Sequence, residues 1–70
     1  MKMTDLKVGR RYFFRSEGGD SKYTVEIGTV DEDCVGFMVL EEDFAPLLPF
    51  YGEIYEPEFD EIYLGEVGVW

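Results

Sequence analysis

The sequence predicts a small all-β domain, with five or six antiparallel strands in a barrel or rolled sheet and no substantial helix. Residues 22–27 alternate between apolar and polar side chains, as in a strand with one buried face. Residues 34–40 form an apolar run of strand length, and the tripeptide Glu-Ile-Tyr occurs at both 53–55 and 61–63. No segment repeats its apolar side chains at the spacing of an amphipathic helix. We therefore expect residues 1–70 to form a single β-rich domain.

The first two expected strands occupy residues 11–15 and 22–27. The first is short and aromatic, and the glycine-containing polar stretch at residues 17–21 predicts the turn after it. In the second, one face carries the apolar side chains of Tyr23, Val25 and Ile27. The apolar series changes phase after Ile27, so Gly28 predicts a β-bulge.

Residues 34–40 are predicted to form a central strand that is covered on both faces, because the run contains no charged side chain. The next apolar stretch, residues 44–51, contains Pro46 and Pro49, which exclude a regular helix or a central strand. We expect this stretch to be a loop that covers an open end of the barrel and buries Phe44, Leu47, Leu48 and Phe50. The alternative is an exposed apolar ridge beside the acids of residues 41–43, which would contact a partner.

The two Glu-Ile-Tyr units predict a β-hairpin in which residues 56–60 are the connection. A last short strand formed by Val67, Val69 and Trp70 is expected to close the sheet. Five or six short strands favour a barrel of the SH3-like or oligonucleotide-binding type.

Charge is distributed very unevenly along the chain. Sixteen acidic residues outnumber six basic ones, which gives a formal net charge of −10. All six bases lie within residues 1–22, whereas residues 23–70 hold thirteen acids and no base. This balance disfavours direct binding to nucleic acid, which needs a positive groove, and it favours a basic protein partner.

The sequence predicts no enzymatic activity. The chain has no His, the commonest general base, and Cys34 opens an apolar run, where burial is favoured over reactivity. Paired carboxylates of the glycosidase type are compatible with the acid content. However, a domain of this length is expected to lack room for a substrate cleft of about 300 Å³ or more.

One partial metal motif is present, but no metal or cofactor is predicted. Asp31, Asp33, Gly36 and Glu42 have the spacing of positions 1, 3, 6 and 12 in an EF-hand calcium loop. Two valines, Val35 and Val39, occupy positions where that loop needs oxygen ligands, and no helices are expected on either side.

A cytoplasmic location is expected, with no contact to membranes. The first five residues lack the apolar segment of a signal peptide, and the single cysteine fits a reducing compartment. No apolar run approaches the roughly 20 residues of a membrane-spanning helix.

These observations predict a small acidic domain that docks on a basic surface of a partner protein. A nucleic-acid-binding protein is one such partner, because closely spaced carboxylates can imitate phosphates; the domain would then be an inhibitor or an immunity-type protein. Three acidic clusters are expected to meet at one rim of the barrel, beside apolar and aromatic side chains. The predicted contact residues are Asp31, Glu32, Asp33, Glu41, Glu42, Asp43, Phe44, Leu47, Phe50, Tyr55, Glu56, Glu58, Asp60, Glu61 and Tyr63.

Three alternatives remain open on the sequence alone. A small barrel can read Lys- or Arg-rich peptides through an aromatic cage, for which the rings of Tyr12, Phe14, Tyr23, Tyr55 and Tyr63 are candidates. The domain can also be a structural subunit of a larger assembly. In the third alternative, the acids only keep an aromatic-rich domain soluble.

Overall fold

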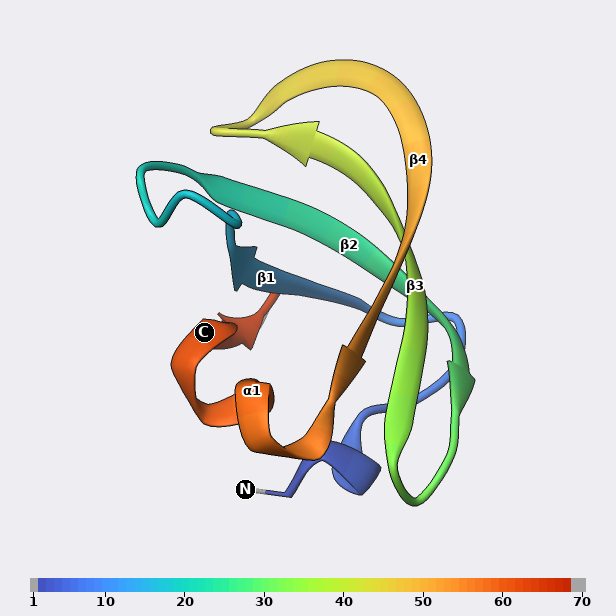
Figure 1. Ribbon diagram of the computed structural model, residues 1–70. Helices are drawn as coiled ribbons and strands as arrows, with labels where there is room; N and C mark the ends of the chain where they lie inside the picture. The colour runs from blue at the N-terminus through green and yellow to red at the C-terminus, as the bar shows by residue number, and fades with distance from the viewer. Residues whose placement is uncertain (1, 69–70) are drawn as a thin grey trace.

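The computed structural model describes residues 2–68, which form five antiparallel strands in one curved sheet (Figure 1). In chain order, the elements are η1 (Met3–Asp5), β1 (Arg11–Arg15), β2 (Lys22–Val30), β3 (Cys34–Glu42), β4 (Ala45–Tyr55), α1 (Glu56–Ile62) and β5 (Tyr63–Glu66). The order of strands is β4-β3-β2-β1-β5. The prediction of a small antiparallel all-β fold is confirmed, but the sheet is not closed into a barrel, because β4 and β5 are its two edges.

The first two strands form as their sequence pattern predicts. β1 pairs with β2 so that Tyr12 lies opposite Val25 and Phe14 lies opposite Tyr23. Val25 is fully buried on the inner face of the sheet, together with Tyr12 and Phe14. The pairing of β2 with β3 shifts register across Gly28, which confirms the predicted bulge.

β3 is the predicted central strand, paired with β2 on one side and β4 on the other. Its inner face carries Val35, Phe37 and Val39, all of which are buried. The prediction of coverage on both faces is wrong, because Met38 on the outer face is 38% exposed. No second layer packs against this face in the described part of the chain.

Residues 45–55 are an edge strand, so the predicted loop is wrong. An edge strand tolerates proline, since one of its sides needs no ladder hydrogen bond. The register shifts between the pairs Glu41–Pro46 and Val39–Phe50, which leaves residues 47–49 opposite a single residue of β3. The resulting bulge directs Leu48 into solvent, where it is 91% exposed.

Of the four side chains expected to cover the barrel end, only one packs on the core. Leu47 is half-buried against the core, whereas Phe44, Leu48 and Phe50 remain exposed.

Residues 56–62 form the helix α1, so the predicted hairpin between the Glu-Ile-Tyr units is wrong. Pro57 lies in the first turn of the helix, where a backbone N–H would have no hydrogen-bond acceptor within the helix, so proline costs nothing there. Phe59 is 3% exposed, and its ring stacks on Tyr63 with 5.0 Å between centroids. β5 therefore pairs with β1 and not with β4.

The predicted closing strand is only partly within the described residues. Val67 follows β5 in a turn, and its N–H donates to the carbonyl oxygen of Arg11 at 3.1 Å. Val69 and Trp70 lie outside the described residues.

The core lies on the inner face of the curved sheet. Met3 and Leu6, from η1 and the residue after it, complete this core together with Phe59 of α1. The Tyr12 hydroxyl accepts a hydrogen bond from the Lys7 N–H at 3.0 Å, which ties the segment after η1 to β1. Within residues 2–68, neither helix has the length or apolar character needed to cross a membrane.

Candidate functional site

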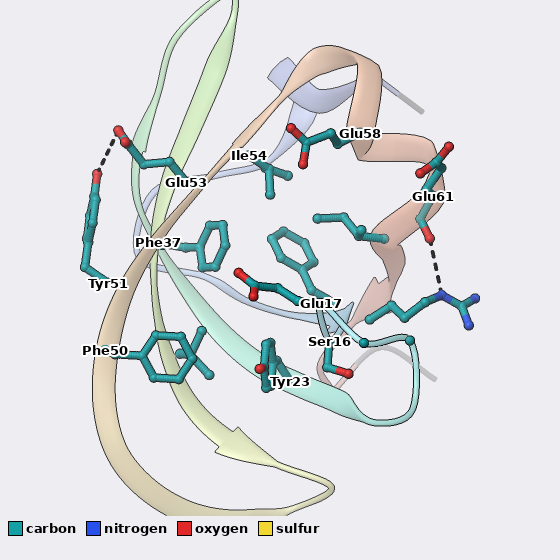
Figure 2. Close-up of a pocket in the computed structure, with 17 residues that line it drawn as sticks. Ser16, Glu17, Tyr23, Phe37, Phe50, Tyr51, Glu53, Ile54, Glu58 and Glu61 are labelled. Atoms are coloured by element: carbon teal, nitrogen blue, oxygen red, sulfur yellow. Dashed lines mark hydrogen bonds between the residues drawn. The ribbon is translucent and has the colours of Figure 1, made fainter.

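A groove of about 640 Å³ opens along β4, opposite α1 and the turn that joins β1 to β2 (Figure 2). We call it the β4 groove. Its volume lies within the range of about 300–1,000 Å³ that is usual for ligand sites. The expectation that this domain lacks room for a cleft is therefore wrong. Space remains because the sheet stays open where a barrel would close.

The floor of the groove is aromatic and apolar. Phe14 and Phe37 meet edge to face with 5.0 Å between ring centroids, and Tyr23 and Phe50 do so at 5.8 Å. Figure 2 shows the rings of Tyr23, Phe37 and Phe50 around the groove. Burial raises the pKa of the Tyr23 hydroxyl above its usual value, with further contributions from Glu42 and Glu17. Tyr23 therefore remains neutral at physiological pH.

Gly52 allows β4 to lie close to this floor. A Cβ atom at this position would be 2.8 Å from Cε2 and 3.0 Å from Cζ of Phe37. Because Phe37 is itself buried, its ring has little room to yield. The close approach of backbone and ring thus needs glycine here.

The rim of the groove is acidic. Glu17 comes from the β1–β2 turn, Glu53 from β4, and Glu58 and Glu61 from α1. Arg15 is the one basic residue in the lining, and its Nε donates to the carbonyl oxygen of Glu61 at 3.3 Å (Figure 2). The residues of the rim thus carry four carboxylates and one guanidinium group, and the Glu53 carboxylate is turned toward the Tyr51 hydroxyl, which donates to it at 3.5 Å (Figure 2).

The bases of the described residues do not neutralise this rim. The ion pairs found within residues 2–68 join Arg10 to Glu66 at 3.0 Å and Arg11 to Glu26 at 3.4 Å. Neither pair includes a rim carboxylate. An apolar floor below a rim in which four carboxylates outnumber one guanidinium group suits a ligand that has both a cation and an apolar stem.

Two of the three predicted acidic clusters lie together. The N–H of Glu56 donates to the carbonyl oxygen of Asp33 at 3.1 Å, which places the start of α1 beside the β2–β3 turn. We call this surface the acidic end; its exposed carboxylates belong to Asp31, Glu32, Asp33, Glu56, Glu58, Asp60 and Glu61. The predicted contact residue Tyr55 is exposed beside them, opposite Cys34 in the ladder.

The third cluster does not join the other two. Glu41 and Glu42 end β3, which begins next to the acidic end, and Asp43 follows in the turn to β4. Nine residues of strand separate the two places by roughly 25–30 Å. The Oδ1 atom of Asp43 accepts from the Lys22 N–H at 2.9 Å, and Glu42 accepts from the Ser21 hydroxyl at 2.6 Å. These two carboxylates thus hold the β3–β4 turn against the start of β2.

The aromatic contact residues have different environments. Phe44 is 63% exposed next to the β3–β4 turn, and the Lys22 Nζ lies 4.2 Å from its ring centroid and 4.3 Å from that of Phe13. Phe50 lines the groove. Tyr63 was predicted to be a contact residue, but its ring packs against the core, because β5 pairs with β1.

The five rings that the sequence offered as candidates for an aromatic cage do not all lie at one place. Tyr12 and Phe14 are buried in the core, and Tyr55 lies on the acidic end. Of the five candidate rings, only Phe14 and Tyr23 line the groove. The groove instead takes Phe37, Phe50 and Tyr51, which the sequence analysis did not assign to a cage.

Glu17 and Glu53 are rim residues that the sequence analysis missed. The residues directly before and after each of them are uncharged, so neither belongs to an acidic cluster in the sequence. Five successive residues of β4, Phe50–Ile54, line the groove, but their pattern in the sequence resembles that of any edge strand.

The partial calcium motif is not gathered into a site. Asp31 and Asp33 precede β3, whereas Glu42 is its last residue. Among residues 2–68, no three acidic or cysteine side chains are arranged to hold a metal ion. Cys34 is half-buried, and its pKa is raised by desolvation and by the charges of Glu53, Asp31 and Asp33, which disfavours the reactive thiolate.

Comparison with known protein families, with characterised proteins and with solved structures finds no match to this chain.

Proposed function

We propose that this domain binds a basic protein, using the acidic end and the β4 groove as one continuous surface. The position of α1 is the observation that supports this proposal. The helix joins the two parts: the backbone N–H of Glu56 is hydrogen-bonded to the β2–β3 turn, and Glu58 and Glu61 line the groove.

The two parts of this surface would act on different steps of binding. Exposed carboxylates attract a basic partner over the Debye length of about 8 Å at physiological salt, which mainly raises the association rate. Apolar contacts in the groove exclude water and slow dissociation. A nucleic-acid-binding protein fits this description, since its own binding groove is basic and accepts closely spaced negative charges.

A charge-reversal experiment tests the proposal. The test variant combines Glu32→Lys with Asp60→Lys in the acidic end. The control variant combines Asp20→Lys with Glu41→Lys, which changes the net charge equally but lies outside that surface. Proteins from a nuclease-treated lysate of the source organism are captured on immobilised wild type and on each variant, at low and at high salt. Melting curves establish that both variants are folded.

We expect the wild type and the control variant to retain a basic protein. This protein should be lost with the test variant, and also at high salt. Equal loss with both variants would mean that only net charge matters. In that case, the acids serve solubility and the proposal is wrong.

A further inference from the structure

We infer that the β4 groove accepts an extended basic segment of the partner, which adds a strand to the free edge of β4. A Lys or Arg side chain of that segment would lie on the aromatic floor, with its charge at the carboxylate rim. This inference rests on the proposed function for the basic nature of the partner, and it adds the conformation of the bound segment and its place.

The first support is the unpaired edge of β4. In the described part of the chain, β4 pairs only with β3, and no other element makes a backbone hydrogen bond to residues 50–54. Both prolines of β4 lie before this segment, so its N–H groups are intact. An edge strand of this kind offers alternating donors and acceptors to a further strand.

The second support is the direction of the groove. Phe50, Tyr51, Gly52, Glu53 and Ile54 are consecutive, and all five line it. Successive side chains of a strand point to opposite faces of the sheet, so a space on one face would meet only every second residue. A groove that meets all five therefore runs along the edge of the strand. Five residues of strand span about 17 Å, which sets the length of the bound segment.

The third support is charge. Glu17, Glu58 and Glu61 line the wall opposite β4, and Glu53 lies on β4 itself, on the outer face of the sheet beside Tyr51 (Figure 2). Arg15 already donates to the backbone of Glu61. Side chains of an added strand alternate between its two faces, so basic ones would approach Glu53 on the outer face and the glutamates of the opposite wall on the inner face. An acidic segment would meet repulsion on both faces.

The fourth support is the way this chain binds an amine of its own. The Lys22 Nζ lies between the rings of Phe13 and Phe44, 4.3 and 4.2 Å from their centroids. Tyr23 and Phe50 offer a similar edge-to-face pair of rings in the groove, with 5.8 Å between centroids. A ring pair near carboxylates attracts a cation more strongly than either feature does alone.

The test uses a synthetic peptide of seven residues in which Lys or Arg alternates with Val. Two control peptides accompany it: one has Glu at each basic position, and the other keeps the charges but carries N-methyl groups on alternate backbone nitrogens. The methyl groups remove strand hydrogen bonds without changing charge. Binding to the intact domain is measured by calorimetry, and amide exchange is followed by NMR.

We expect the basic peptide to bind, and the Glu peptide to show no binding at millimolar concentration. N-methylation should raise the dissociation constant by about tenfold or more, which is equivalent to the loss of one to two hydrogen bonds. Amides on the free edge of residues 50–54 should become protected from exchange when the basic peptide binds.

Two protein variants locate the site. Glu53→Lys should weaken peptide binding about tenfold, because it replaces attraction by repulsion at the edge of the groove. Glu41→Lys changes the net charge equally but lies outside the groove, so its effect should stay below about twofold at physiological salt. Both positions are exposed or half-exposed, and melting curves verify the folding of each variant.

Equal binding of the N-methylated and unmodified peptides, or equal weakening by Glu53→Lys and Glu41→Lys, would overturn the inference. So would a basic peptide that does not bind at all. The proposed function would survive each of these results if the wild type still retained a basic protein that the Glu32→Lys and Asp60→Lys variant loses. Peptide binding thus tests the groove, and retention of a basic protein tests the acidic end, so the two results can differ.

Discussion

Gly52 lines the groove at a position where the fold leaves no room for a side chain. Gly52→Ala would place a Cβ atom 2.8 Å from the ring of Phe37, so β4 or the ring must move. We expect a loss of about 1–3 kcal/mol in the free energy of unfolding, the usual cost of overpacking a core. Chemical denaturation measures this change.

Gly28→Ala is the matched control. Its Cβ atom would meet the carbonyl oxygen of Gly36 at 3.6 Å, an ordinary contact, and its backbone has no positive φ angle. This variant should be neutral or more stable by up to about 1 kcal/mol, since alanine reduces the freedom of the unfolded chain. Equal destabilisation by both substitutions would contradict the close approach described for Gly52.

Phe44 adopts a backbone conformation that is costly for its residue type. Its φ angle is 68°, in the left-handed region, and that of Asp43 is 50°. This conformation costs a non-glycine residue about 1–2 kcal/mol. The ring contacts with Phe13 and Lys22 offset this cost by about 0.5–1 kcal/mol each at an exposed site.

The backbone cost and the ring contacts of Phe44 together predict which of two variants, Phe44→Gly or Phe44→Ala, is the more stable. Phe44→Gly loses the ring contacts but relieves the backbone, so its stability should stay within about 1 kcal/mol of the wild type. Phe44→Ala loses the contacts and keeps the strain, and it should be less stable than Phe44→Gly by about 1 kcal/mol. Thermal denaturation of the three proteins gives the order. An alanine variant that is more stable than the glycine variant would contradict the strained conformation.

Tyr63 makes stability depend on alkaline pH. Burial, and then Tyr12 and Glu66, raise its pKa above the ordinary tyrosine value of 10.0. The folded protein therefore holds this proton more tightly than the unfolded chain does. The corresponding stability is fully present below pH 10 and declines as pH rises from 10 through the pKa of the folded state. Tyr63→Phe should reduce this decline, as seen in denaturation curves recorded from neutral to alkaline pH.

A second tyrosine provides the control for this comparison. Tyr55→Phe removes the hydroxyl of an exposed ring and should leave the alkaline decline as it is in the wild type. The assignment to Tyr63 fails if both variants lose stability with pH at the same rate.

At the scale of elements, α1 depends on one buried side chain. A helix of seven residues is not stable alone, and its amino-acid sequence has no basic residue in the last turn to favour the helix dipole. Phe59 is its buried residue, stacked on Tyr63. Phe59→Ala should cost about 3–5 kcal/mol, a large part of the stability of so small a domain. Urea denaturation followed by circular dichroism measures the loss.

Asp60→Ala, on the same helix, is the control. Asp60 is exposed near the helix C-terminus, where a negative charge is unfavourable, so its removal should change stability by no more than about 0.5 kcal/mol. A comparable loss in both variants would show that α1 contributes through its backbone and not through Phe59.

The elements that the sequence predicts correctly are those with a local pattern. β2 is evident from the alternation of Tyr23, Val25 and Ile27, and the bulge follows from the phase change at Gly28. α1 was mistaken for a hairpin connection, because its apolar spacing, from Phe59 to Ile62 and Tyr63, is only one turn long. Pairing of β5 with β1 joins residues about fifty positions apart, and no local pattern encodes such a partner.

At the scale of the molecule, the acidic end was predictable and the groove was not. Asp31–Asp33 and the acids of residues 56–61 are clusters in the sequence itself. Glu17 and Glu53 line the same groove only because the sheet curves and stays open between its edges. Whether a sheet closes depends on strand tilt and stagger, which short sequence patterns do not specify.

Net charge sets the last prediction, which concerns the whole molecule. A charge of −10 is contained in a body with a radius of gyration of 11.0 Å, close to the screening length at physiological salt. The two ion pairs of the described residues use Arg10 and Arg11 and leave the acidic end uncompensated. Repulsion among its carboxylates therefore opposes folding.

Added sodium chloride should accordingly raise the melting temperature between low and physiological ionic strength. The Glu32→Lys and Asp60→Lys variant replaces two repelling carboxylates by attracting ammonium groups in the acidic end. It should melt above the wild type at low salt and respond less to added salt, because less repulsion remains to be screened. Salt also acts on apolar surfaces, but that effect is similar in both proteins, so the difference between their salt responses isolates the charge term. Identical responses would mean that the carboxylates of the acidic end do not repel one another enough to affect folding.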